Sequence, residues 1–212
     1  MQIHLDVLML TQKKGGFVYV IFGPMFSGKT GELFRNLRRV EISEALKGTA
    51  KIIILFKPQK DGRYSDTEAV THNGEIREAV VVRTIQDIKD WIAKNPVDII
   101  AIDEGQFFDI HELNIFASSQ ADQGKIVVIA TLDQDFRTIP FDGVPKLIVD
   151  ADFTQQLHPV CVGCGGLASR SRRTVDVGDT IHVGGKEAYE PLCRTCYNER
   201  EMDDFQEHAT EE

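Results

Sequence analysis

The segment GPMFSGKT at positions 23–30 has the residue types and spacing that most directly imply chemistry. It matches every fixed position of the phosphate-loop pattern G-x-x-x-x-G-K-[ST], with an apolar run before it and an amphipathic stretch after it. Inward-pointing backbone N–H groups and the start of the following helix attract phosphate in such a loop. Lys29 can then reach the β- and γ-phosphates, and the Thr30 hydroxyl can ligate Mg²⁺. An ordinary glycine-rich turn is the weaker interpretation. We expect a nucleoside triphosphate to bind along the whole segment: Gly23, Pro24, Met25, Phe26, Ser27, Gly28, Lys29 and Thr30.

Two adjacent carboxylates, Asp103 and Glu104, follow the apolar run at positions 99–102. Asp103 fits the Walker-B position, which holds Mg²⁺. Successive strand residues point to opposite sides, so we expect Glu104 to face another part of the cleft. There it could accept the proton of an acceptor hydroxyl. Many ATPases carry the same pair and use the glutamate to activate water, so this motif alone leaves kinase and ATPase open.

The four cysteines form two Cys-x-x-Cys pairs, Cys161 with Cys164 and Cys193 with Cys196. Together they supply the four thiolates of a closed, structural Zn²⁺ site. Residues 165–192 separate the pairs, which is more than the about 15–20 residues of a zinc ribbon, and would form a loop whose ends meet at the metal. Disulfides or free thiols are the alternative, but this clustering in an unexported chain favours a metal.

Hydrophobic patterning predicts the elements that position these groups. Near-continuous Val/Ile runs indicate strands buried on both faces of a mostly parallel sheet, and strands alternating with amphipathic helices indicate an α/β domain. We expect strands at 17–22, 52–56, 79–83, 97–103, 125–131 and 146–150, and helices at 29–45, 85–93 and 112–121. After about residue 157 the long apolar runs end, which predicts a small metal-stapled subdomain.

Composition narrows the function classes. The 212 residues have 42% hydrophobic and 27% charged residues and a formal net charge of −9, which suits a soluble globular protein and disfavours nucleic acid or anionic lipid as a partner. No apolar stretch approaches the ~20 residues of a membrane-spanning helix, and the start has no secretory pattern. We therefore expect a cytoplasmic protein that binds neither membrane nor nucleic acid.

Taken together, the motifs GPMFSGKT, KDGRYSD (60–66), DEGQFF (103–108), LDQDFR (132–137) and the cysteine pairs resemble the type II thymidine kinases, which are cytosolic and contain zinc. The resemblance covers residues 16–197. It implies an α/β, RecA-like P-loop domain at 16–157 with a mostly parallel sheet. It also implies a zinc-stapled subdomain with a lasso loop at 158–197. For the acidic tail at 198–212 we expect fraying or disorder.

The resemblance also implies transfer of the γ-phosphate of ATP to the 5′-hydroxyl of thymidine with Mg²⁺, in nucleotide salvage. It gives Glu104 as the proton acceptor. On the nucleotide side it implies Asp103, Gln106, Asp61 and Arg63, with Mg²⁺ held by Thr30 and Asp103. Around the thymine it implies Met25, Phe107, Leu132, Phe136, Phe141, Thr180, Ile181, His182, Val183, Gly184 and Tyr189. Family members are typically homotetramers inhibited by thymidine triphosphate.

Some features depart from the family pattern. Residues 1–15 have no clear counterpart in the family. Gln134, Asp135 and His182 replace the residues expected at their positions, which leaves the preference between thymidine and deoxyuridine open. A RecA-like ATPase that handles nucleic acid is the alternative from another class, and the basic cluster at 170–173 is its best support. A zinc-stapled binding module without catalysis would leave Lys29 and Glu104 unexplained.

Overall fold

The carboxyl ends of parallel strands meet at one edge of a central six-stranded sheet. The computed structural model describes residues 15–59, 68–70, 74–175 and 188–209. The strand order is β5-β2-β6-β7-β1-β8, and neighbouring strands are paired in parallel. The strands are β1 (Phe17–Phe22), β2 (Ile53–Pro58), β5 (Val80–Val82), β6 (Ile99–Ile102), β7 (Ile126–Thr131) and β8 (Phe153–Gln156). The predicted α/β class with a mostly parallel sheet is confirmed.

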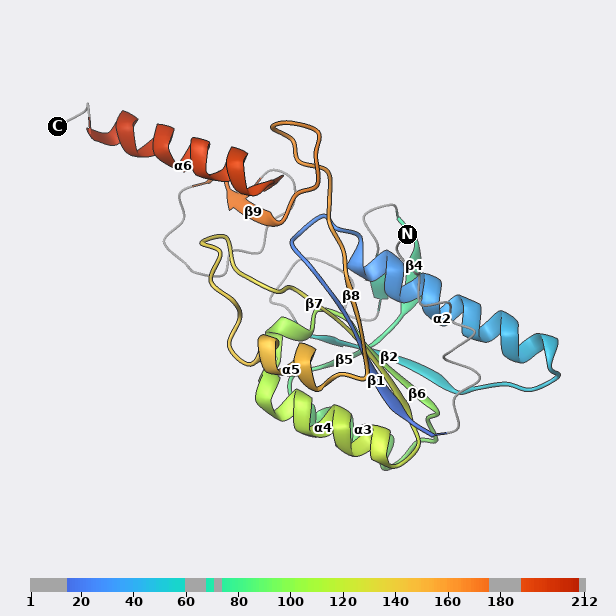
Figure 1. Cartoon of the computed structure of the whole chain (residues 1–212). Coiled ribbons are helices and arrows are strands. Elements are labelled where there is room, and N and C mark those ends of the chain that lie inside the picture. The colour runs from blue at the N-terminus through green and yellow to red at the C-terminus, as the bar shows by residue number, and fades with distance from the viewer. Residues whose placement is uncertain (1–14, 60–67, 71–73, 176–187, 210–212) are drawn as a thin grey trace.

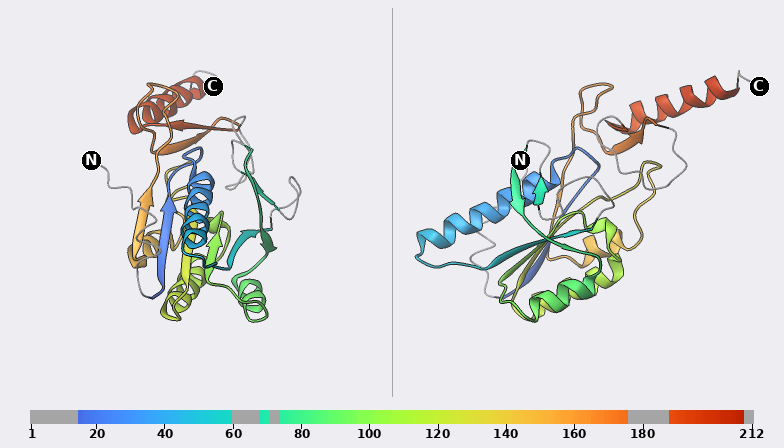
Figure 2. Two further views of the ribbon diagram at one scale, coloured as in Figure 1. Left: turned by 90° about the vertical axis from the view of Figure 1, so that its right-hand side faces the viewer. Right: turned by 180° about the vertical axis from the view of Figure 1, so that it is seen from behind.

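Helices cover both faces of this sheet, as Figure 1 and Figure 2 show. On one face lies α2 (Lys29–Leu46); on the other lie α3 (Ile85–Ile92), α4 (Ile110–Asp122) and α5 (Val144–Asp150). Alternate residues of β1 divide between the two layers. Val18 and Val20 pack with the α3–α5 layer, whereas Phe17, Tyr19 and Ile21 pack with α2. Burial on both faces explains why the strand is continuously apolar. None of the described helices has the length and apolar composition needed to cross a bilayer.

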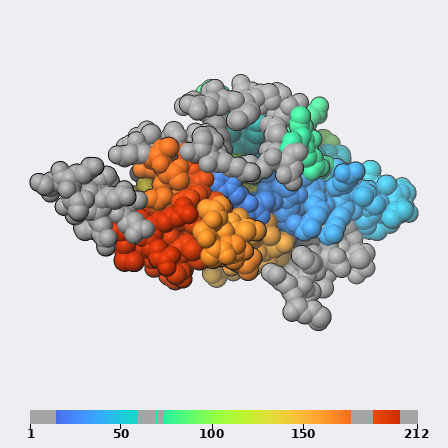
Figure 3. Space-filling view, turned by 90° about the horizontal axis from the view of Figure 1, so that it is seen from above, coloured from blue at the N-terminus to red at the C-terminus, as the bar shows by residue number. Residues whose placement is uncertain are grey.

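Smaller elements surround the sheet. A hairpin pairs β3 (Glu68–Val70) with β4 (Ile76–Glu78), and the 3₁₀ turn η1 (Gly105–Phe107) follows β6. Beyond the sheet, β9 (Arg170–Arg173) pairs antiparallel with β10 (Tyr189–Leu192), and α6 (Arg194–Ala209) follows. Figure 3 shows these C-terminal segments, in orange and red, lying against the blue N-terminal segment. The acidic tail is helical as far as Ala209; residues 210–212 lie outside the described part.

The predicted strand at 146–150 is wrong, because this segment belongs to α5. Gly143, with φ 77°, precedes the helix and Pro145 stands in its first turn, where the missing N–H has no intrahelical partner to lose. Val144 and Leu147 are fully buried at a spacing of three residues, which is a helical period. A short apolar run does not distinguish the two structures by itself. The sixth strand is instead the more polar β8.

Leu147→Ala should destabilise the protein far more than Val149→Ala. Leu147 is fully buried, whereas Val149 is 81% exposed. We expect a loss of about 2–5 kcal/mol for the first and within about 0.5 kcal/mol for the second, measured by denaturant unfolding. Residues two apart on a strand would share a face, so similar losses at both positions would contradict the helix.

Candidate active site

The phosphate loop joins β1 to α2 in a conformation that depends on its glycines. Gly28 precedes α2 in the left-handed region, with φ 85°, and a Cβ there would meet nothing within 4 Å. Gly23 has φ 147°, and a Cβ there would lie 2.2 Å from the carbonyl oxygen of Leu157. The Lys29 ammonium folds back into the loop and donates to the Pro24 carbonyl at 2.7 Å. The loop therefore encloses a positive charge at the start of a helix, as anion binding requires.

Carboxylates surround this ammonium. Burial lowers the pKa of Lys29 to about 8, and the negative charges of Glu104, Asp133 and Asp103 oppose that shift. Asp103 and Glu104 follow β6, and Asp133 follows β7, which lies between β6 and β1 in the sheet. The parallel sheet thus brings together one partly buried cation, which follows β1, and three acids, which follow β6 and β7.

The oxygens beside the loop form a donor set that suits a hard divalent cation. The Thr30 hydroxyl donates to both carboxylate oxygens of Asp103, at 3.1 and 3.0 Å. Burial, and after it the charge of Glu104, raises the pKa of Asp103 to about 7. Oδ1 of Asp133 is buried and has no hydrogen-bond partner within the described structure. A cation at this point would supply the charge that buried carboxylates need, and hydroxyl and carboxylate oxygens are what Mg²⁺ prefers.

Glu104 leaves the strand direction at once. Its backbone is left-handed, with φ 56° and ψ 42°, and its carbonyl accepts from Phe107 N at 3.1 Å to start η1. The Gln106 amide donates to the Glu104 carboxylate at 2.5 Å. The tight turn, rather than a continued strand, therefore sets the direction of Glu104, and the charges of both Glu104 and Asp103 act on Lys29.

The residues expected around the base come from three segments and are all partly buried: Met25 in the phosphate loop, Phe107 in η1, and Leu132, Phe136 and Phe141 in the segment after β7. Phe141 also packs against the α3–α5 core. Tyr189, on β10, is buried. Asp61, Arg63 and the expected lasso residues 180–184 lie outside the described residues.

Contacts from the C-terminal subdomain hold these segments in place. Met25 N donates to the Ser171 hydroxyl at 2.9 Å. The Tyr197 hydroxyl donates to the Phe136 carbonyl at 2.7 Å, and the Arg173 guanidinium lies 3.9 Å from the centre of the Phe136 ring. Sequence reasoning missed Ser171 and Tyr197, and no local pattern marks either, because each acts through a partner far along the chain.

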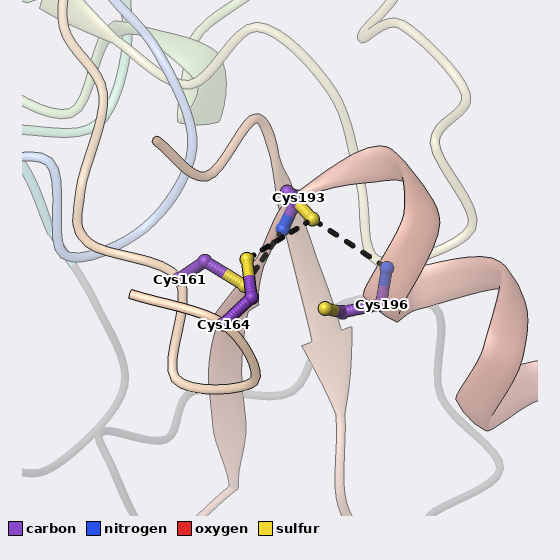
Figure 4. A group of neighbouring side chains, drawn as sticks. All are labelled: Cys161, Cys164, Cys193 and Cys196. Atoms are coloured by element: carbon purple, nitrogen blue, oxygen red, sulfur yellow. Dashed lines mark hydrogen bonds between the residues drawn. The ribbon is translucent and has the colours of Figure 1, made fainter. Parts of the chain in front are cut away.

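The four cysteines converge as predicted (Figure 4). Their sulfur atoms all lie within 4.8 Å of one another, and Sγ of Cys164 is 3.7 Å from Sγ of Cys193. A tetrahedral Zn²⁺ with Zn–S bonds of ~2.3 Å would separate its sulfurs by about 3.8 Å. No disulfide joins these cysteines.

The titration of the thiols also suits a metal. Burial raises the pKa of Cys161, but hydrogen bonds from the backbone of Cys193, Cys164 and Gly163 outweigh it and bring the pKa to about 6. Hydrogen bonding with the Cys193 thiol and burial raise the pKa of Cys196 to about 12. Four neighbouring thiols cannot all lose their protons unless a cation neutralises the negative charge. The cluster is therefore compatible with zinc.

Comparisons with known proteins identify relatives of this chain. The family model described as thymidine kinase matches residues 16–197. Thymidine kinases from two strains of Porphyromonas gingivalis are 43% identical over 182 residues, which cover 86% of this chain and 85% of each relative. Among solved structures, domain III of the Thermotoga maritima replication initiation protein DnaA aligns with a TM-score of 0.42 and 17% identity over 72% of this chain and 60% of that one. That likeness is too slight to bear on fold or function.

Gly23→Ala should destabilise the protein, whereas Gly31→Ala should not. An alanine at 23 would need the left-handed conformation and would meet the backbone of Leu157, which cannot give way. We expect a loss of about 1–3 kcal/mol or more in unfolding free energy. Gly31 lies in α2 with open space at its Cβ position, so alanine should stabilise by about 0.5–1 kcal/mol. Equal midpoints for the two variants in urea would contradict the close approach at Gly23.

Proposed function

This chain belongs to the thymidine kinase family, and we propose that its phosphate loop, Asp103 and Glu104 transfer the γ-phosphate of ATP to the 5′-hydroxyl of thymidine. The observation that carries this assignment is the meeting of Lys29, Asp103 and Glu104 at one edge of the sheet. A cation that can bind the β- and γ-phosphates and a carboxylate that can accept a hydroxyl proton thereby share one site.

Each group has a distinct task in the proposed reaction. The N–H groups of the phosphate loop and the Lys29 ammonium bind the triphosphate. Thr30 and Asp103 would hold Mg²⁺, which supplies neutralisation of phosphate charge when bound. Glu104 accepts the proton of the 5′-hydroxyl as that oxygen bonds to the γ-phosphorus and the bond to ADP breaks. Positioning and charge stabilisation therefore do most of the catalytic work.

Met25, Leu132 and Phe136, which the family resemblance places around the base, are all partly buried, and their apolar side chains would suit a pyrimidine ring beside this site. An apolar pocket with few polar groups suits a small nucleoside. Exclusion of water matters because water competes with the 5′-hydroxyl for the phosphoryl group. By the family resemblance, the lasso residues 180–184 and Tyr189 close this pocket. We further propose that the four cysteines bind Zn²⁺, which would fix both ends of the lasso and reduce the entropy lost on closure.

The alternative of an ATPase that handles nucleic acid loses its best support in the structure. Arg170 is only 8% exposed, Arg172 pairs with Glu190 at 3.0 Å, and Arg173 lies over the Phe136 ring. The basic cluster is thus engaged in contacts with Glu190 and Phe136 and offers no exposed stripe for a phosphate backbone.

Further proposals rest on the family resemblance alone. They are a homotetramer, inhibition by thymidine triphosphate, acceptance of deoxyuridine, a cytoplasmic location, and nucleotide-side roles for Asp61 and Arg63. The domain limits 16–157, 158–197 and 198–212 also stay predictions. Sedimentation of the purified chain would test the tetramer, and thymidine 5′-monophosphate production with added thymidine triphosphate would test inhibition.

Glu104→Gln should bind ATP normally but lose about 10²–10⁴-fold in turnover, because the amide cannot accept the hydroxyl proton. The measurement is thymidine 5′-monophosphate formation with saturating ATP and Mg²⁺, together with ATP affinity by calorimetry. Glu112→Gln is the matched control: this half-exposed acid pairs with Lys89 on α3 and should leave turnover unchanged. Near-normal turnover of Glu104→Gln would show that another group accepts the proton.

Cys193→Ser should lose bound zinc. The hydroxyl is a poor replacement for a thiolate, so we expect metal affinity to fall by about 100-fold or more. The loosened subdomain should raise the KM for thymidine or prevent folding. Metal content of the purified protein, by atomic emission, is the direct readout. Thr195→Ser, at an exposed position between the ligands, is the control and should retain the metal. Wild-type kinetics in a zinc-free Cys193→Ser protein would defeat the assignment.

A further inference from the structure

The Gln106 side chain is buried between two fixed partners. It is 7% exposed and belongs to η1, immediately after Glu104 and Gly105. Its carbonyl oxygen Oε1 accepts from Leu132 N at 3.0 Å and from the Thr131 hydroxyl at 3.4 Å. Its amide nitrogen Nε2 donates to Oε2 of Glu104 at 2.5 Å. One side chain therefore links the end of β7 to the carboxylate that we assign as proton acceptor.

The chemistry of these partners fixes which way the amide points. The backbone N–H of Leu132 can only donate, so the atom that faces it must be the Gln106 carbonyl oxygen. The amide nitrogen then faces the Glu104 carboxylate, which as an ionised group can only accept. A glutamine satisfies both neighbours at once. A glutamate at 106 would satisfy Leu132 but would place an oxygen against the Glu104 carboxylate.

Glu104 needs such a restraint because one neighbouring charge repels its carboxylate and another attracts it. Asp103 precedes it directly with a like charge, while the Lys29 ammonium attracts it. The side chain has three rotatable bonds on a turn at the edge of the sheet, so attraction to Lys29 alone would not define where its oxygens lie. The short hydrogen bond from Gln106 fixes the position of one of them.

The same link ties Glu104 to the expected nucleoside pocket. Leu132, whose N–H anchors Gln106, is also one of the residues expected beside the base. The hydrogen bonds from Leu132 N to Gln106 and from Gln106 to Glu104, joined by the planar Gln106 amide, would then help to set the separation between a bound nucleoside and Glu104. A displacement of about 1 Å of a reacting group can cost about 10²-fold in rate.

We propose that Gln106 is a positioning residue: it holds the Glu104 carboxylate in place for proton transfer and does not bind the nucleotide. This inference rests on the proposed role of Glu104. It differs from the nucleotide-side role that the family resemblance implies for Gln106.

Gln106→Glu tests this inference because it keeps the acceptor for Leu132 and replaces the donor to Glu104 with an oxygen that repels it. We expect kcat for thymidine phosphorylation to fall by about 10²-fold, with the KM for ATP close to wild type. If Gln106 only stabilises the end of β7, the variant should have a normal kcat. If Gln106 binds the nucleotide, the variant should have a raised KM for ATP. Either of those results would overturn the proposal.

A double-mutant cycle with Gln106→Met separates this inference from the proposed function. Methionine fills a similar space without any of the three hydrogen bonds. If Gln106 acts through Glu104, Gln106→Met should lower kcat in the wild-type background and add less than about 3-fold in the Glu104→Gln background. Additive losses would overturn the positioning role while leaving Glu104 as the acceptor. Wild-type turnover of Glu104→Gln alone would instead overturn the proposed function itself.

Discussion

A partly buried positive charge, the ammonium of Lys29, is the constraint on which the rest of the site depends. Burial of an ammonium is costly unless opposite charge or hydrogen-bond acceptors surround it. The Pro24 carbonyl accepts from it, and the charges of Glu104, Asp133 and Asp103 favour its protonated form. The phosphate loop can therefore keep a cation inside the protein, where its attraction for a polyanion is less screened than in water.

The parallel sheet is what brings these groups together. Lys29 follows β1, Asp103 and Glu104 follow β6, and Asp133 follows β7, which lies between those two strands. The C-terminal subdomain then reaches back across the same edge. Ser171 accepts from Met25 in the phosphate loop, and Tyr197, one residue after Cys196, donates to Phe136. These two hydrogen bonds connect the subdomain that carries the four cysteines to both the phosphate loop and the segment expected around the base.

Patterns within a few residues of one another predicted most of the strands and the convergence of the four cysteines. The phosphate loop, the acidic pair and the cysteine pairs are short motifs whose chemistry depends on spacing, and most buried strands are continuous apolar runs. The run at 146–150 failed because valine, leucine and isoleucine fit a buried helix as well as a strand, and only packing of Leu147 against the core decides between them. The more polar β8 was missed because it lies at the edge of the sheet. There its pairing with β1, and not an apolar run, makes the segment a strand.

The amino-acid sequence by itself determined the phosphate-binding loop, the two acids after β6, the set of four thiols and the family. Only the tertiary structure decided which groups meet. Gln106 forms a hydrogen bond with Leu132, 26 residues away along the chain, and Met25 forms one with Ser171, 146 residues away. A hydrogen bond depends on the position and direction of both partners, and for distant residues the folded backbone sets these. No local spacing in the chain encodes them.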